Sequence, residues 1–122
     1  MKINERGTNM EITGEIKDFL YKKLAHLDKF IDQTDDSIIC DVELGKTTNH
    51  HKNGDIFRAE INVFMDGQTL RAVAEEEDLF SAIDIAKDEI VREVKISKDK
   101  KISLIRRGGA KIKGMVKGIL GN

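Results

Sequence analysis

The chain of 122 residues has no tryptophan, no proline, one tyrosine and one cysteine. A lone cysteine, Cys40, excludes a disulfide framework within the chain and suits a reducing cytosol. No apolar run is long enough to span a bilayer. The N-terminus, MKINERG, has no apolar run after its charges, which is not the pattern of a signal peptide. We therefore expect a cytoplasmic protein that is one domain by size and has no membrane partner.

Sequence motifs that carry catalysis are also missing. We find no P-loop, no GxGxxG and no Ser-His-Asp pattern. The candidate metal ligands are His50, His51, His26 and Cys40. They have no CxxC or HxxxH spacing, and adjacent histidines on an extended loop point apart. The run 75–78 is acidic, but carboxylates favour a helix start there. The sequence predicts a binding module, not an enzyme, with no metal, cofactor or small-molecule substrate.

Charge is distributed unevenly along the chain. Residues 1–96 carry 13 Lys and Arg against 21 Asp and Glu, a net charge of −8, whereas residues 97–122 carry 8 basic residues and one acidic residue. Five glycines in the second segment oppose a stable helix. We predict a folded domain over 1–96 and a basic, glycine-rich flexible tail over 97–122. Such a tail is typical of a polyanion-binding arm, and a solubilising extension explains it equally well.

Alternating apolar and polar residues predict four strands. They are expected over 1–6, 37–44, 57–65 and 70–74. Asp66-Gly67 is a hairpin signal, and residues 45–54 read as a polar loop. Glu5 interrupts the apolar side of the first strand, so it needs a partner or a place near the strand end.

Two apolar stripes at helical spacing predict two helices. The first is expected from an N-cap at Thr13 to about Phe30, and the second from an N-cap at Asp78 to about Ile96. The order is β-α-β-β-β-α. Because each strand has one apolar face, we predict an α+β fold with a four-stranded sheet and two helices packed on one face.

Basic side chains form a stripe on each predicted helix. The candidate residues are Lys22, Lys23, His26 and Lys29 on the first helix and Lys87, Arg92, Lys95 and Lys98 on the second. Two neighbouring stripes suit a phosphate backbone, which such contacts position without reading its sequence. The alternative is an ordinary solvated helix surface. Three acidic neighbours, Asp18, Asp28 and Asp88, weaken the basic signal.

Several segments resemble the ribosome hibernation promoting factor family, also called ribosome-associated inhibitor A or protein Y. They are RGTNMEIT, KKLAHLDKF, FRAEINV and LRAVAEEEDLFSAIDIAKDEIVRE, and the resemblance covers about residues 1–98. It implies a cytoplasmic protein that binds the small ribosomal subunit, both 16S rRNA and ribosomal proteins, near the decoding centre. It also implies that mRNA and tRNA are blocked, so that translation is inhibited and idle ribosomes are protected. The implied fold resembles a double-stranded RNA-binding domain.

The resemblance extends to part of the basic stripes. It carries RNA-binding roles onto Lys23, Lys29, Arg92, Lys95 and Lys98, whereas the other three candidates rest on the residues alone. Departures from the family pattern are Glu89 and Ile96, where basic residues are usual, and Glu5 in place of an apolar residue. The tail is too short and glycine-rich to match the dimerisation domain of long family members.

A second function remains open on the sequence alone. The outward residues Asp41, Glu43 and Glu60 predict an acidic sheet face. That face, together with the basic tail, is also compatible with a protein-interaction module.

Overall fold

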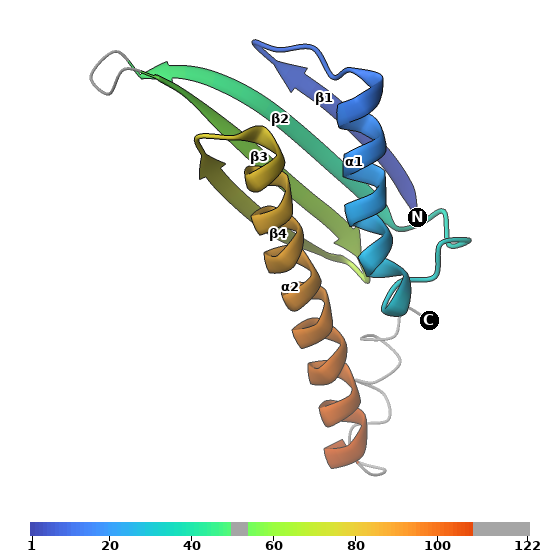
Figure 1. The fold of residues 1–122 in the computed structure, drawn as a ribbon. Coiled ribbons are helices and arrows are strands. Elements are labelled where there is room, and N and C mark those ends of the chain that lie inside the picture. Colours follow the sequence, from blue (N-terminus) through green and yellow to red (C-terminus); the bar gives the residue numbers. More distant parts are fainter. Residues whose placement is uncertain (50–53, 109–122) are drawn as a thin grey trace.

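The computed structural model describes residues 1–49 and 54–108 and has the predicted order of elements (Figure 1). The elements are β1 (Lys2–Thr8), α1 (Gly14–Leu24), the short 3-10 helix η1 (Ala25–Lys29), β2 (Ile39–Asn49), β3 (Gly54–Met65), β4 (Gln68–Glu76) and α2 (Leu79–Gly108). The predicted α+β fold class is confirmed.

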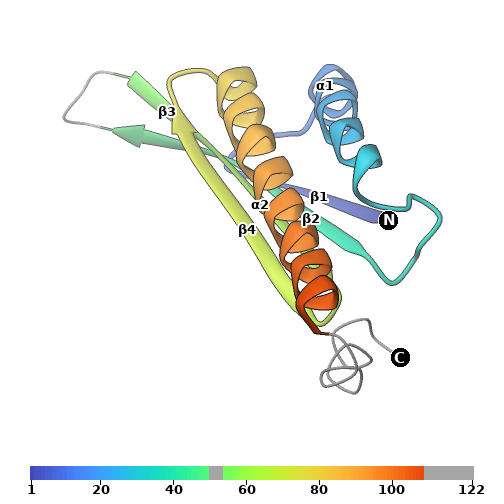
Figure 2. The same cartoon turned by 90° about the horizontal axis from the view of Figure 1, so that it is seen from below.

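The four strands form one mixed sheet in the order β1-β2-β3-β4. β1 pairs in parallel with β2, so α1 and η1 form the crossover between them, and the other two pairs are antiparallel. Both helices cover the same face and leave the other open (Figure 2). The prediction of a loop over 45–54 was too long, because β2 continues to Asn49 and β3 starts at Gly54. An ion pair of 3.1 Å between Lys46 Nζ and Asp55 Oδ2 joins the two extensions.

The core lies between the open-faced sheet and the two helices. Its fully buried large side chains are Leu20, Leu24, Leu27, Leu44, Ile61, Ile83, Ile90, Val63, Val94 and Cys40. Burial of each such aliphatic side chain contributes about 1.5–3 kcal/mol before entropy costs. Six of them lie on the predicted apolar stripes of the helices, and the other four, Cys40, Leu44, Ile61 and Val63, lie on predicted strands. The core therefore fixes which helix faces point to solvent.

Helix starts follow the predicted caps, whereas the helix ends do not. Thr13 Oγ1 accepts a hydrogen bond from the Ile16 amide at 3.4 Å, and Asp78 Oδ2 accepts one from the Ser81 amide at 3.1 Å. The second helix was predicted to end at Ile96, but it continues to Gly108 and extends past the sheet (Figure 1). Its continuation contains no glycine before Gly108. Lys101 also pairs with Asp66 in the β3–β4 turn, which holds the added turns against the sheet.

No helix in the described ranges, 1–49 and 54–108, is both long and apolar enough to cross a membrane. Residues 109–122 lie outside those ranges, so the flexibility of the tail stays a prediction.

Candidate nucleic-acid interface

The candidate interface is built on α1, η1 and α2, which lie side by side on the sheet (Figure 2). The rings of Phe19 and Phe80 meet edge to face with centroids 4.8 Å apart. One helical turn along, Lys23 Nζ lies 3.0 Å from Asp84 Oδ1. These contacts join α1 to α2, so the basic stripes of the two helices belong to one layer.

Most of the sequence-predicted cations lie on the exposed side of this layer. Lys22, His26, Lys29, Arg92 and Lys95 are exposed, and Lys98 is half-buried. Among the described residues, the four lysines and Arg92 form no ion pair with any carboxylate. Their charges are therefore available to a ligand, and phosphate is the anion that such a cationic layer suits.

Lys23 and Lys87 differ from the other candidates because both are paired. Lys23 is 26% exposed, pairs with Asp84 and lies 5.2 Å from the centroid of the Phe19 ring. Lys87 is only 9% exposed, donates a hydrogen bond to Asp88 and lies 3.4 Å from Asp84. The bond to Asp88 is the main reason that the pKa of Lys87 is raised. Lys87 was expected to flank an exposed stripe, and the structure buries it instead.

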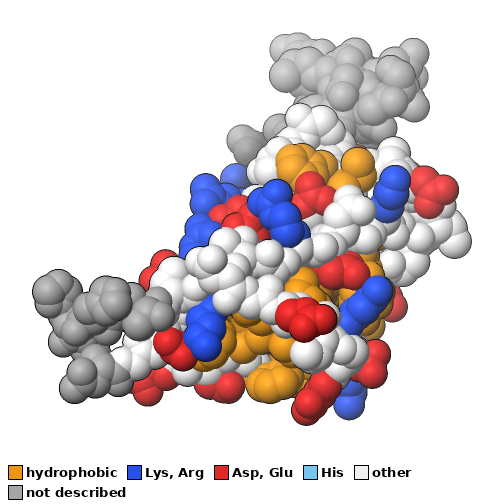
Figure 3. Space-filling model, turned by 90° about the horizontal axis from the view of Figure 1, so that it is seen from above, with side chains coloured by type: hydrophobic (Ala, Val, Ile, Leu, Met, Phe, Trp, Pro, Cys, Tyr) orange, Lys and Arg blue, Asp and Glu red, His pale blue; other side chains and the backbone are white. Residues whose placement is uncertain are grey.

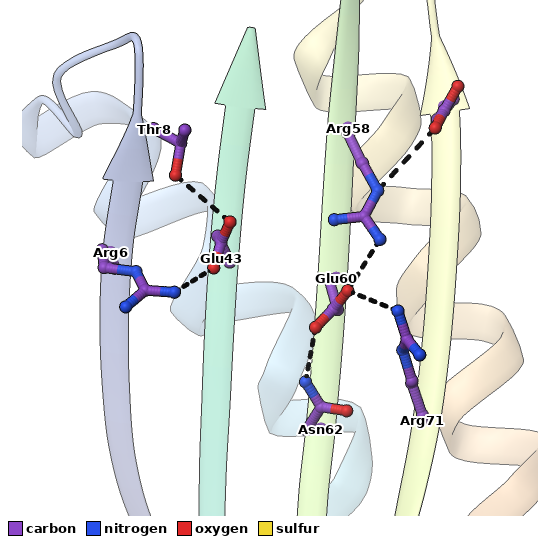
Figure 4. A network of polar contacts seen from close by, with 8 residues as sticks. Arg6, Thr8, Glu43, Arg58, Glu60, Asn62 and Arg71 are labelled. Atoms are coloured by element: carbon purple, nitrogen blue, oxygen red, sulfur yellow. Dashed lines mark hydrogen bonds and ion pairs between the residues drawn. The ribbon is translucent and has the colours of Figure 1, made fainter.

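The open face of the sheet carries a second set of charges, and these are bonded to one another (Figure 4). Glu60 Oε1 accepts hydrogen bonds from Arg58 at 2.7 Å and from Arg71 at 2.9 Å, while Asn62 donates to its other oxygen at 2.9 Å. These hydrogen bonds, that from Asn62 first, lower the pKa of Glu60 to about 2 against the opposing effect of burial. Glu60 is therefore the centre of a network that spans β3 and β4.

A second network on the same face joins β1 to β2. Arg6 pairs with Glu43, and Thr8 Oγ1 donates to the same carboxylate at 3.2 Å. Asn4 Nδ2 donates to Asp41 Oδ1 at 2.9 Å. Figure 3, seen from above, shows Lys and Arg side chains interleaved with Asp and Glu side chains.

The prediction of an acidic sheet face was incomplete. It counted the carboxylates of this face without their arginine partners. Register decides the outcome, since Arg6 stands opposite Glu43 and Arg58 stands opposite Glu75 in the sheet. These networks were missed although the arginines are visible in the sequence, because the signal that would have found them is the pairing of strands.

The remaining polar expectations concern residues close to the core. Glu5 has the partners that its position requires, because Tyr21 donates to it at 2.8 Å and Lys17 lies 3.1 Å away. The hydrogen bond from Tyr21 is the main cause of the lowered pKa of Glu5. Cys40 is fully buried in the core, and burial raises the pKa of its thiol to about 12.

Metal binding has no candidate cluster in the part of the chain that the structure describes. No group of three or more His, Cys, Asp or Glu side chains lies close enough there to hold an ion. His50 and His51 lie outside that part. In the acidic run, Asp78 caps α2 and Glu75 lies 3.7 Å from Arg58.

A comparison with protein families now identifies the chain. The family model described as "Sigma 54 modulation protein / S30EA ribosomal protein" matches residues 3–102. The chain belongs to this family.

Curated relatives in this family are ribosome hibernation factors. The chain is 31% identical to the ribosome hibernation promoting factor of Klebsiella oxytoca over 100 residues, which cover 82% of the chain and 96% of that factor. It is 28% identical to the ribosome hibernation promotion factor of Bacillus subtilis over 110 residues, or 90% of the chain. The chain spans only 55% of that longer factor. The resemblance to the ribosome hibernation promoting factor family is therefore confirmed.

Solved structures of the family share the fold. The N-terminal domain of Thermus thermophilus Protein Y is 36% identical and superposes with a TM-score of 0.65, covering 79% of this chain and 98% of that one. A ribosomal subunit interface protein from Coxiella burnetii gives a TM-score of 0.64 at 21% identity, over 81% of this chain and 99% of that one, and shows the fold alone.

Proposed function

We propose that this protein is a cytoplasmic, non-enzymatic ribosome hibernation factor that binds the small ribosomal subunit near the decoding centre. There it excludes mRNA and tRNA by occupying their space, so that translation is inhibited and idle ribosomes are protected. The partners in this proposal are 16S rRNA and the ribosomal proteins around it. Membership of the family supports the general role, and the charge arrangement of the helices supports the surface.

One observation carries the choice of surface. Two adjacent helices present five cations with no ion-pair partner among the described residues, namely Lys22, Lys29, Arg92, Lys95 and Lys98. Free cations gain most from RNA because each one neutralises a phosphate and releases a counterion. With five such contacts, a rise in salt from about 50 to about 200 mM is expected to lower the affinity by roughly 10²–10³-fold.

The mechanism is steric and needs no chemical step. Phosphate contacts position the domain, and they carry no sequence information by themselves. Selectivity for the small subunit then comes from the shape of the RNA cleft that the rigid domain fills. His26 and Lys23 lie beside the free cations and complete the proposed surface. Lys87 takes part in this surface only indirectly, through its ion pairs with Asp84 and Asp88.

The test is charge reversal on the helices. Replacing Lys22, Lys29, Arg92 and Lys95 with Glu is expected to abolish co-sedimentation with purified small subunits while the circular dichroism spectrum and thermal unfolding stay those of the parent. Undiminished co-sedimentation would refute the site. Two single variants form a matched pair of test and control, because Lys2 and Lys22 are both exposed lysines without an ion pair in the described chain. Lys22→Glu is expected to weaken binding, and Lys2→Glu on β1 is not.

The alternative, a protein-interaction module that uses the sheet face and the tail, has less support. Its premise was an acidic face, but the glutamates of that face are matched by arginines. Filter binding with 16S rRNA separates the two functions, because an interaction module retains no RNA at physiological salt.

A further inference from the structure

Asp84 is a carboxylate in the middle of a cationic layer. It lies on α2 opposite α1, and one of its oxygens serves two ammonium groups, Lys23 Nζ at 3.0 Å and Lys87 Nζ at 3.4 Å. The side chain of Asp84 is 45% exposed, so a ligand that approaches the two helices meets it. Asp84 therefore holds the position that a ligand phosphate would take beside Lys23.

Electrostatics keep this aspartate charged. The hydrogen bond from Lys23 is the main cause of its lowered pKa, and the charges of both lysines add to the effect. An ionised carboxylate beside Lys23 opposes a phosphate in two ways: it occupies the ammonium group, and it repels the incoming anion. The pair with Lys23 contributes little to stability because both side chains are partly exposed, and the buried Lys87 has a second carboxylate partner in Asp88.

We propose that Asp84 is an internal counterion of Lys23 that suppresses binding of unspecific RNA where α1 and α2 meet. This inference rests on the proposed function and adds the residue that limits it. Selectivity is often achieved by an element that disfavours the wrong partners. A flexible single strand can place a phosphate wherever a cation is free. A folded subunit offers phosphates only at fixed places, so the pairing of Lys23 with Asp84 weakens binding of a single strand more than binding of the subunit.

The decisive variant is Asp84→Asn, which keeps the shape of the side chain and frees Lys23, while Lys87 keeps its hydrogen bond to Asp88. Asp18→Asn is the matched control, because Asp18 is exposed on α1, forms no ion pair among the described residues, and gives the same change in net charge. The probe is poly(U), measured by filter binding at several salt concentrations. We expect Asp84→Asn to bind about 3–10-fold more tightly and to steepen the salt dependence by about 0.7, the contribution of one freed lysine. Asp18→Asn should change affinity less than about twofold.

A double variant locates the origin of the gain. If the gain comes from Lys23, adding Lys23→Gln to Asp84→Asn removes most of it, as a double-mutant cycle would show. Asp84→Asn that binds poly(U) no better than Asp18→Asn would overturn the inference, and so would an equal gain for purified small subunits. Failure of the parent protein to bind small subunits would instead overturn the proposed function. The two failures are therefore distinguishable.

Discussion

The two faces of this molecule both carry arginine or lysine, but they differ in whether those cations are already paired. On the sheet face Arg6, Arg58 and Arg71 each pair with a glutamate. On the helix face five cations have no such partner among the described residues, whereas Lys23 and Lys87 are paired with aspartates. The five are Lys22, Lys29, Arg92, Lys95 and Lys98. Availability of charge, and not its amount, therefore distinguishes the faces. A domain with a net charge of −8 over residues 1–96 can still present a cationic surface.

Strand geometry and helix geometry explain the difference. Opposed residues on neighbouring strands have Cβ atoms about 5 Å apart, so an Arg that stands opposite a Glu is within reach of an ion pair with it. On a helix a partner must lie three or four residues away and must also be free. Asp88 stands four residues before Arg92, but its carboxylate accepts the hydrogen bond of Lys87. Asp88 is therefore not available to Arg92.

The largest expected effect comes from neutralising the free cations. Replacing Lys22, Lys29, Arg92 and Lys95 with Ala removes about four phosphate contacts, so affinity for small subunits should fall about 10³-fold and the salt slope should decrease by about 3–4. Binding is measured by titration at several salt concentrations. Arg6→Gln with Arg71→Gln is the sheet-face counterpart and should stay within about twofold of the parent. Equal losses of affinity in both variants would show that the cations of the two faces are equally available to RNA.

A smaller effect is expected from the centre of the sheet network. Glu60→Ala leaves Arg58, Arg71 and Asn62 without their shared acceptor. Because the Glu60 side chain is only 18% exposed, we expect a loss of about 1–2 kcal/mol in the free energy of unfolding, with subunit binding unchanged. Urea unfolding measures the first quantity and co-sedimentation the second. A variant with parental stability and weaker binding would place the RNA surface on the sheet.

Periodicity explains why the sequence predicted the fold and its core. The stripe that contains Leu20, Leu24 and Leu27 stays on one side of the first helix whatever its last turn does, and that turn is in fact a 3-10 helix. The end of α2 could not be predicted in the same way. The glycines of segment 97–122 all lie at or after residue 108, so the glycine content of the whole segment concealed a helix-forming stretch over 97–107. The ion pair between Lys101 and Asp66 is a tertiary contact, which local sequence does not reveal.

The candidate site could be predicted only in outline. Helical spacing placed Lys22 and Lys29 on a solvent face, and the structure exposes both. Spacing could not show that Lys87 is buried, because its surroundings depend on how α1 and α2 pack. The pairing of Arg58 with Glu60 and Glu75 depends on strand register in the same way. Sequence reasoning therefore found the cations and could not tell which of them are free.

The two flanks of α1 contact different parts of the molecule. One flank faces α2, and the other faces β1, where Tyr21 donates its hydroxyl to Glu5 at 2.8 Å. Tyr21→Phe removes this donor from a half-buried carboxylate and is expected to cost about 0.5–1 kcal/mol, because Tyr21 is partly exposed. Thermal unfolding measures the loss, and small-subunit binding should not change. Weaker binding in this variant would mean that the β1 flank also contributes to the surface.

The last expected effect is a pH dependence of stability to which the sheet network contributes. The pKa of Glu60 is about 2 in the folded protein, below its ordinary value of 4.5. A lowered folded pKa means that the ionised form stabilises the fold above about pH 4.5 and that this stability is lost as the pH falls toward 2. Glu60→Gln cannot ionise, so the stability gap between the parent and this variant should be largest near pH 7 and should narrow below pH 4.5. Urea unfolding of both proteins at matched pH cancels the contribution of the other carboxylates. A gap that stays constant from pH 7 to pH 3 would show that Arg58 and Arg71 do not distinguish a charged from a neutral side chain at this position.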